Sequence, residues 1–269
     1  MKAKSNSVKT KTVAVVPINA LISAKSRLAA YMAETDRRAL VLWMAGGVLA
    51  ALRASGAIER IAVVSPDAQV LRWAREHGAQ PLLQRDSGLN AGLEQGRRWA
   101  YAMGADALLI LLADLPCLAS DEVAMFVRRG EASPIVLAPD RREQGTNGLL
   151  VHLDGQSCGS ELLAHAPSRG SKEPRIVEGV RSFPFAFGVD SLSRHRALAR
   201  ERGIEPDVFT APGLRFDVDT PADLAMLYEY GIWMPGDHDD YPDYRGYQDY
   251  QDYHEYPVGA GEGNREMWP

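Results

Sequence analysis

Residues 107–116 read Ala-Leu-Leu-Ile-Leu-Leu-Ala-Asp-Leu-Pro, an apolar run that ends at a single carboxylate, Asp114. The run is too short to cross a membrane, and its uniform hydrophobicity is typical of a strand buried on both faces. Because an unpaired charge does not fit inside such a strand, Asp114 is expected just beyond its carboxyl end. Ligands bind at that edge of open parallel sheets, although a carboxylate here can also serve only to cap the turn before Pro116.

Strands and helices alternate along the rest of the chain. Apolar runs predict further strands at 12–16, 60–65, 79–83, 134–138 and 149–153. Helices are predicted over 35–53, 67–77, 90–103 and 191–203, and from Ser120 and Thr220 onward. Asn90 and either Thr35 or Asp36 are expected as N-caps. The alternation predicts a doubly wound, mostly parallel sheet in a three-layer α/β/α arrangement of Rossmann type.

The segment 17–28, which follows the first strand, is expected to be a loop too polar and irregular to pack. It carries Lys25 and Arg27, and polar groups follow each of the next strands as well. These groups are Ser65 and Pro66, then Gly88 and Asn90, and then Asp114. Each has a plain alternative as a solvated charge, a turn or a cap. Because all of them are expected at one edge of one sheet, together they favour a nucleotide site with cations and backbone N–H donors for phosphates.

A second acidic pair, Asp217 and Asp219, follows another short apolar stretch. Two carboxylates from separate strand ends can hold a hard divalent cation such as Mg²⁺ against a phosphate. No G-x-G-x-x-G follows the first strand and no G-x-x-x-x-G-K-[ST] occurs in the chain, which argues against a dinucleotide-binding oxidoreductase and a P-loop NTPase.

Charge and composition set the limits on localisation and partners. The net charge of the 269 residues is -5, but residues 235–269 alone carry nine acids and two bases, so the remainder is about +2. A near-neutral body argues against nucleic-acid binding. The start lacks the apolar stretch of a signal peptide and no segment reaches membrane-spanning length, so we expect a cytoplasmic protein with no membrane partner.

The sequence divides into a flexible start at 1–11, one domain at 12–234 and a disordered acidic tail at 235–269. In the tail, tyrosines recur every third residue among acids, a spacing that fits neither helix nor strand. A solubilising tail and a docking segment are the two readings. Residues 154–186 have little periodicity and are expected to be an inserted loop.

Seven motifs, taken in order, carry a family resemblance: Ala24-Lys25-Ser26-Arg27-Leu28, Val63-Val64-Ser65-Pro66-Asp67, Gly88-Leu89-Asn90-Ala91-Gly92, Asp114-Leu115-Pro116, Gly145-Thr146-Asn147, Phe187-Gly188-Val189-Asp190-Ser191 and Asp217-Val218-Asp219-Thr220-Pro221. Over residues 12–231 the chain resembles the CofC/FbiD guanylyltransferases of coenzyme F-420 biosynthesis, which are related to the molybdenum-cofactor and sugar nucleotidyltransferases. The resemblance implies a nucleotidyltransferase fold of the GT-A-like type. It also implies that a phosphorylated three-carbon acid attacks the α-phosphate of GTP and releases pyrophosphate.

The same resemblance implies roles for single residues. Asp114 and Asp217 match the metal carboxylates for Mg²⁺, with Asp219 as an alternative ligand or a supporting group, and Lys25 and Arg27 would neutralise the triphosphate. Gly88, Asn90 and the Ser65-Pro66 turn would shape the guanosine pocket. The acid would be bound by Thr146, Gly188 and Ser191. The resemblance implies phosphoenolpyruvate, with 2-phospho-L-lactate or 3-phosphoglycerate as alternatives. Ser191 can also be an ordinary helix cap.

Asn19 departs from the family pattern, because many relatives carry a cation there. Two other functions stay open: a sister nucleotidyltransferase that uses CTP or a molybdopterin substrate, and a catalytically silent nucleotide-binding module. The partners expected are GTP and the phosphorylated acid, with a homodimer and a hand-off to the deazaflavin transferase of the pathway as further expectations.

Overall fold

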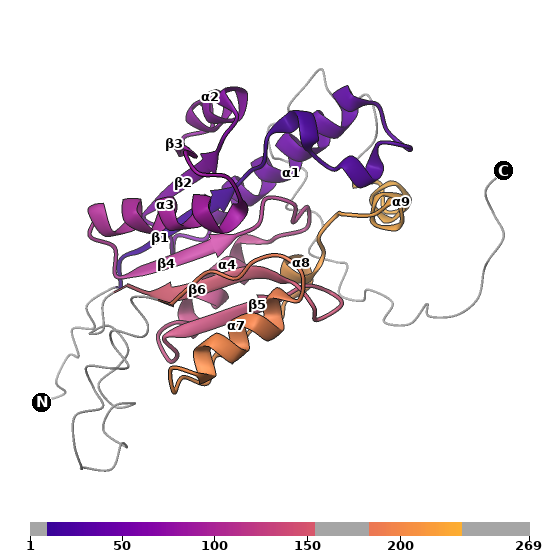
Figure 1. The fold of residues 1–269 in the computed structure, drawn as a ribbon. Coiled ribbons are helices and arrows are strands. Elements are labelled where there is room, and N and C mark those ends of the chain that lie inside the picture. The colour runs from indigo at the N-terminus through magenta and orange to yellow at the C-terminus, as the bar shows by residue number, and fades with distance from the viewer. Residues whose placement is uncertain (1–9, 154–182, 233–269) are drawn as a thin grey trace, which may run out of the picture.

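The computed structural model describes residues 10–153 and 183–232, and its centre is a seven-stranded sheet (Figure 1). The strands are β1 (Thr12–Pro17), β2 (Arg60–Ser65), β3 (Gln80–Leu83), β4 (Ala107–Leu111), β5 (Ile135–Pro139), β6 (Thr146–His152) and β7 (Asp207–Val208). Their order is β3-β2-β1-β4-β6-β5-β7. β6 runs antiparallel to β4 and β5, whereas all other pairs are parallel. The predicted mostly parallel sheet is confirmed.

Helices cover both faces of the sheet (Figure 1). They are α1 (Glu34–Ala54), α2 (Ala68–Glu76), α3 (Leu89–Ala102), α4 (Ser120–Arg129), α7 (Ser191–Arg200), α8 (Pro212–Arg215) and α9 (Pro221–Glu229). Successive strand side chains point to opposite faces, so Ala14 and Val16 pack with α1, α2 and α4, whereas Val13 and Val15 pack with α3 and α7. The strands β1, β4, β5 and β6 are thus buried on both faces, as the uniform apolar run at 107–112 predicted for β4.

The prediction that segment 17–28 is too polar to pack is wrong. It forms two short 3₁₀ turns, η1 (Leu21–Ser23) and η2 (Ser26–Leu28). Apolar side chains recur there every three or four residues, and Ile18, Leu21, Ala24 and Leu28 are all buried. These few apolar residues therefore hold the loop by packing into the hydrophobic core.

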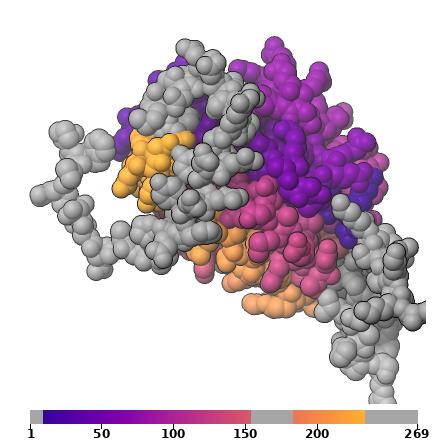
Figure 2. Space-filling model, turned by 180° about the vertical axis from the view of Figure 1, so that it is seen from behind, coloured from indigo at the N-terminus to yellow at the C-terminus, as the bar shows by residue number. Residues whose placement is uncertain are grey.

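A third apolar cluster joins this loop to the far end of the described chain. Its members come from η2, the start of α1, α9 and the segment before α9, and they are Leu28, Met32, Leu40, Met44, Phe216, Val218, Leu224 and Leu227. Figures 1 and 2 show α9 beside the indigo segment that follows β1. This packing places the two Asp residues that precede α9 next to the cationic loop.

Several helix starts differ from the prediction. α1 begins at Glu34 after Ala33, so Thr35 and Asp36 lie inside its first turn and neither is the N-cap. α3 begins after Gly88, which has a φ of 96°, and Asn90 is therefore also not a cap. The capping box of Thr220 and Asp223 at the start of α9 agrees with the sequence prediction.

Two predicted segments fall on residues outside the described part of the chain. Of the expected inserted loop 154–186, only residues 183–186 are described, and the acidic tyrosine-rich tail at 235–269 is not. The domain boundaries therefore stay predictions. In the ranges 10–153 and 183–232, no helix combines the length and apolar character that a membrane span requires.

Candidate active site

A lysine lies between two carboxylates at the carboxyl edge of the sheet. Lys25 Nζ is 2.6 Å from Asp114 Oδ2 and 2.8 Å from Asp219 Oδ1. Arg27 Nη1 is 3.9 Å from the other oxygen of Asp219. Asp114 comes just after β4, whereas the other three residues come from the loop after β1 and the segment before α9. Together with Asp217, they form what we call the charged cluster.

Asp217 is the second carboxylate beside Asp114. Burial raises the pKa of Asp217 to about 6, and the negative charge of Asp114 adds to this effect. Asp217 Oδ1 accepts a hydrogen bond of 3.4 Å from Asn147 Nδ2. Among the described residues, the buried Oδ1 of Asp114 finds no hydrogen-bond partner. A cation shared by these carboxylates would both satisfy that oxygen and relieve their repulsion.

The other two ionisable groups are shifted toward their charged forms. Burial disfavours the ammonium of Lys25, but Asp114 and Asp219 outweigh burial and raise the pKa of Lys25 above its ordinary value. For Asp219, burial likewise opposes the charge, yet Lys25, Arg27 and Arg142 lower its pKa. Arg142 lies exposed in the turn between β5 and β6 and was not predicted as a site residue. It adds a third cation to this part of the site.

The packing of alternate residues determines where the carboxylates of Asp217 and Asp219 lie. Phe216 and Val218 are buried in the third apolar cluster, so Asp217 and Asp219 are left outside it. The Val218 N–H donates to the carbonyl oxygen of Asp114 at 3.3 Å, which ties this segment to the end of β4. Asp223 Oδ2 then accepts from the Asp219 N–H at 3.1 Å.

The carboxylates Asp114 and Asp217 fit a Mg²⁺ ion that is shared with a phosphate. Mg²⁺ at nucleotide sites commonly takes one or two carboxylates and completes its shell with phosphate oxygens and water. Within residues 10–153 and 183–232, no three or more His, Cys, Asp and Glu side chains gather closely enough to hold a metal ion. In this conformation Asp219 forms an ion pair with Lys25, so a role for Asp219 as a metal ligand stays a prediction.

Thr146, Ser191 and His195 form a second, uncharged group beside the first. The Ser191 Oγ accepts from the Thr146 N–H at 2.8 Å, and Thr146 Oγ1 lies 3.0 Å from His195 Nδ1. All three residues are buried. Gly188 is exposed nearby with a φ of 120°, and a Cβ there would lie 3.3 Å from Arg194 Nη2. We call Thr146, Gly188, Ser191 and His195 the neutral cluster.

The predicted guanosine residues follow β2 and β3, on the far side of β1. Ser65 is buried and its Oγ accepts from the Asp67 N–H at 3.1 Å, while Pro66 and Gly88 are exposed. Asn90 instead reaches the neutral cluster: its Nδ2 donates to the Phe187 carbonyl at 3.1 Å, and its Oδ1 accepts from the Phe187 N–H at 2.9 Å. The structure therefore gives Asn90 a structural contact in place of a free amide, and its guanosine role stays a prediction.

Residues with strained, left-handed backbone conformations lie in or next to both clusters. Three described residues other than glycine have positive φ angles, namely Lys25 at 47°, Glu143 at 56° and Asp190 at 52°. Lys25 belongs to the charged cluster, Asp190 precedes Ser191, and Glu143 follows Arg142. Left-handed conformations are costly for such residues and tend to concentrate where a site requires them.

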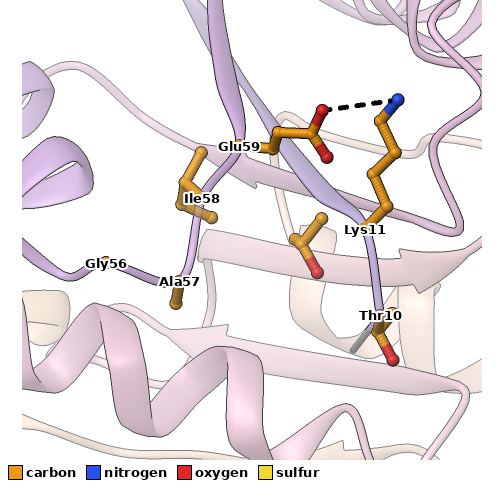
Figure 3. A pocket seen from close by; sticks show the side chains of 7 residues that line it. Thr10, Lys11, Gly56, Ala57, Ile58 and Glu59 are labelled. Atoms are coloured by element: carbon orange, nitrogen blue, oxygen red, sulfur yellow. Dashed lines mark ion pairs between the residues drawn. The ribbon is translucent and has the colours of Figure 1, made fainter. Parts of the chain in front are cut away.

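A shallow pocket lies at the opposite edge of the sheet, where β1 and β2 begin (Figure 3). Its lining includes Lys11 and Glu59, which form an ion pair of 3.4 Å. Lys11 Nζ also donates to the Met103 carbonyl at 2.6 Å. Because its charges are already paired and none of the predicted site residues lines it, this pocket is separate from the candidate active site.

Known proteins share much of this sequence. The sequence matches the family described as "Guanylyl transferase CofC like" over residues 12–165. It is 42% identical over 216 residues to the phosphoenolpyruvate guanylyltransferase of Sphaerobacter thermophilus, covering 80% of this chain and 92% of that protein. The enzyme of the same name from Rubrobacter xylanophilus is 40% identical over 219 residues, covering 81% and 94%. The chain belongs to the CofC-like guanylyltransferase family.

The fold agrees with this membership. A nucleotidyl transferase from Methanothermobacter superposes with a TM-score of 0.53 at 15% identity, covering 82% of this chain and 97% of that one. A 4-diphosphocytidyl-2C-methyl-D-erythritol synthase from Anaerococcus prevotii gives 0.53 at 10% identity, covering 84% and 100%. As a CofC-like protein with this architecture, the chain is a nucleotidyltransferase, and its relatives make it a guanylyltransferase.

Proposed function

We propose that this guanylyltransferase joins GTP to phosphoenolpyruvate with Mg²⁺, and that it releases pyrophosphate. The observation that carries the proposal is the charged cluster, in which Lys25, Asp114, Asp217 and Asp219 meet at the ligand-binding edge of the sheet. The acid is suggested by the names of the relatives from Sphaerobacter and Rubrobacter. The GDP-linked acid would then pass to the deazaflavin transferase of coenzyme F-420 biosynthesis.

The proposed reaction needs charge neutralisation more than proton transfer. An oxygen of the acid's phosphate forms a bond to the α-phosphorus of GTP, and the bond from that phosphorus to the β-phosphate oxygen breaks. Because the attacking phosphate is already an anion, no general base is required. Lys25 and Arg27 would stabilise the leaving pyrophosphate, and Arg142, whose charge helps to lower the pKa of Asp219, would assist.

Asp114 and Asp217 would hold the Mg²⁺, whose chemistry is to neutralise phosphate charge that develops in the transition state. The bound cation would also hold Asp217 ionised, since it favours the charged form that burial disfavours. Lys25 would keep Asp219 charged and oriented. The neutral cluster would receive the carboxylate end of the acid.

A pyrophosphate-release assay tests this function. The full chain is incubated with Mg²⁺, each of the four NTPs, and phosphoenolpyruvate, 2-phospho-L-lactate or 3-phosphoglycerate. We expect GTP with phosphoenolpyruvate to be the best pair, with measurable turnover of at least one other acid, because a pocket separates ligands that differ by one small group only by about 1–3 kcal/mol. A preference for CTP would indicate the sister nucleotidyltransferase, and no turnover with any pair would indicate a silent nucleotide-binding module.

A further inference from the structure

His195 is a buried histidine that the proposed reaction does not use. It lies on α7, one helical turn after Ser191, and has no exposed surface. Its ring packs edge-on against Phe187 at a centroid distance of 4.9 Å. Both ring nitrogens have partners at 3.0 Å: Nδ1 contacts Thr146 Oγ1, and Nε2 accepts from the Ala186 N–H.

These two contacts fix the protonation of the ring. A backbone N–H can only donate, so Nε2 carries a lone pair and no hydrogen. The neutral ring then has its single hydrogen on Nδ1, which donates to the Thr146 hydroxyl. Burial lowers the pKa of His195 to about 4, and the charge of Arg194 adds to this, so the ring stays neutral near pH 7.

The direction of this hydrogen bond determines what the Thr146 hydroxyl can do. Because its oxygen accepts from His195, its own hydrogen is available for another acceptor. Ser191 is in the same situation, since its oxygen accepts from the Thr146 N–H. Over the described ranges, neither hydroxyl donates to a protein acceptor. Ser191 directly follows the exposed residues Gly188, Val189 and Asp190, and Thr146 comes two residues after the exposed Gln144, so both buried hydroxyls are close in sequence to exposed backbone.

We propose that His195 is a positioning residue that holds Thr146 as an acceptor, so that the Thr146 and Ser191 hydroxyls both donate to the carboxylate of the bound acid. This inference rests on the proposed function, because it assigns a carboxylate to the neutral cluster. A ring with its hydrogen on Nε2 would instead accept from Thr146, and the carboxylate would lose one of its two donors. The histidine thus determines that the Thr146 hydroxyl donates to the substrate, without touching the substrate itself.

Matched variants separate this role from simple packing. His195→Asn keeps an N–H donor near the position of Nδ1, whereas His195→Leu keeps similar volume without a donor. We expect His195→Leu to raise the KM of phosphoenolpyruvate about tenfold, with kcat and the KM of GTP changed less than about twofold, and His195→Asn to stay within about threefold of the parent. In the Thr146→Val background, His195→Leu should raise the acid KM no further.

Equal losses in His195→Asn and His195→Leu, or a further loss in the Thr146→Val background, would overturn the proposal and leave His195 a packing residue. An unchanged acid KM in His195→Leu would overturn it as well while the proposed function stands. Nitrogen-15 NMR of the imidazole rings gives a readout that does not depend on turnover. The signal that disappears in His195→Asn should show hydrogen on Nδ1 and none on Nε2, and the opposite tautomer would refute the inference.

Failure of the proposed function itself has a different signature. If the parent protein released no pyrophosphate with any acid and NTP, the carboxylate assignment would fall together with that function. The NMR result would still decide whether His195 directs the Thr146 hydroxyl.

Discussion

The charged cluster and the neutral cluster meet at two consecutive residues of β6 but are built in different ways. Thr146 belongs to the neutral cluster, and the next residue, Asn147, donates to Asp217 in the charged cluster. Adjacent strand residues face opposite sides of the sheet, so one short stretch serves both. The charged cluster is partly exposed and is held by ion pairs, whereas Thr146, Ser191 and His195 of the neutral cluster are buried and held by hydrogen bonds between uncharged groups.

The difference indicates a division of labour. In the proposed reaction, charges at the edge of the sheet would act on charge that develops during nucleotidyl transfer, so their loss should appear mainly in kcat. Fixed donors in the neutral cluster would bind the carboxylate, a group that does not change during the proposed reaction, so their loss should appear mainly in the KM of the acid. The variants below test this division, beginning with the largest expected effect.

Asp114→Asn should lower kcat about 10²-fold or more with a small change in the acid KM, because the amide cannot neutralise a shared Mg²⁺. Steady-state pyrophosphate release in saturating Mg²⁺ measures both constants. Glu131→Gln, which removes a charge from an exposed position after α4, is the matched control and should leave both unchanged. A normal kcat in Asp114→Asn would show that catalysis does not depend on this carboxylate.

Lys25→Met should lower kcat about 10- to 100-fold. Without Mg²⁺ it should also lower the free energy of unfolding by about 1–2 kcal/mol, because Asp114 and Asp219 lose their shared cation. Added Mg²⁺ should then stabilise the variant more than the parent, since the ion replaces the missing charge. Thermal unfolding with and without Mg²⁺ measures this difference. Equal stabilisation of the two proteins would show that the metal does not bind at this cluster.

Much of the fold was predictable because it depends on local patterns. Uniform apolar runs predicted the strands that are buried on both faces, and Thr220 with Asp223 predicted the start of α9. The reversed direction of β6 was not predictable, since side-chain alternation is the same in either direction. The packing of segment 17–28 was missed because its apolar residues pack with residues distant in sequence. Leu28 shares a cluster with Phe216 and Val218, about 190 positions away, and Ile18, Leu21 and Ala24 join the core on the α1 face of the sheet.

The sequence predicted that the charged residues lie together, but it did not predict the contacts of the Asn90 amide. Lys25, Arg27, Asp114 and Asp219 are brought together, because charged groups at strand ends share one edge. Asn90 looks like a cap in the sequence, but its amide pairs with a backbone 97 positions away. His195 was missed because it stands in a basic helix that resembles a solvated face. Its spacing of four from Ser191 was the one signal that it lies on the same buried side.

Asp217 should make stability and activity depend on pH in opposite directions. Because burial raises its pKa to about 6, the folded protein binds this proton more tightly than the unfolded chain does. Its contribution to stability is therefore full below the ordinary pKa of an Asp and is lost as the pH rises through about 6. At subsaturating Mg²⁺, activity should instead decrease below about pH 6, by up to about tenfold per pH unit, because the proton competes with Mg²⁺ for this carboxylate.

The variant Asp217→Asn tests both directions at once. Without Mg²⁺ it should be more stable than the parent at pH 8, by about 1–2 kcal/mol, and of similar stability near pH 4, while its activity is lost. Denaturant unfolding at the two pH values measures the difference. A variant that is less stable than the parent at pH 8 would contradict the raised pKa and show that the carboxylate of Asp217 is stabilised as an anion.

Asn90→Ala should give the smallest effect. It tests whether Asn90 supports the binding of the acid or that of the nucleotide. Both polar atoms of Asn90 bind the backbone of Phe187, whose ring packs on His195 and whose next residue is Gly188. Losing these hydrogen bonds should let residues 187–188 shift, and raise the acid KM about threefold to tenfold, with the KM of GTP changed less than about twofold. Gln95→Ala is the control, because Gln95 lies on the same helix and its amide bonds the backbone of Leu83 and Arg85, away from Phe187. If Asn90→Ala raised the KM of GTP and left that of the acid unchanged, Asn90 would bind guanosine. Asn90 on α3 would then belong to the nucleotide site and not to the acid site.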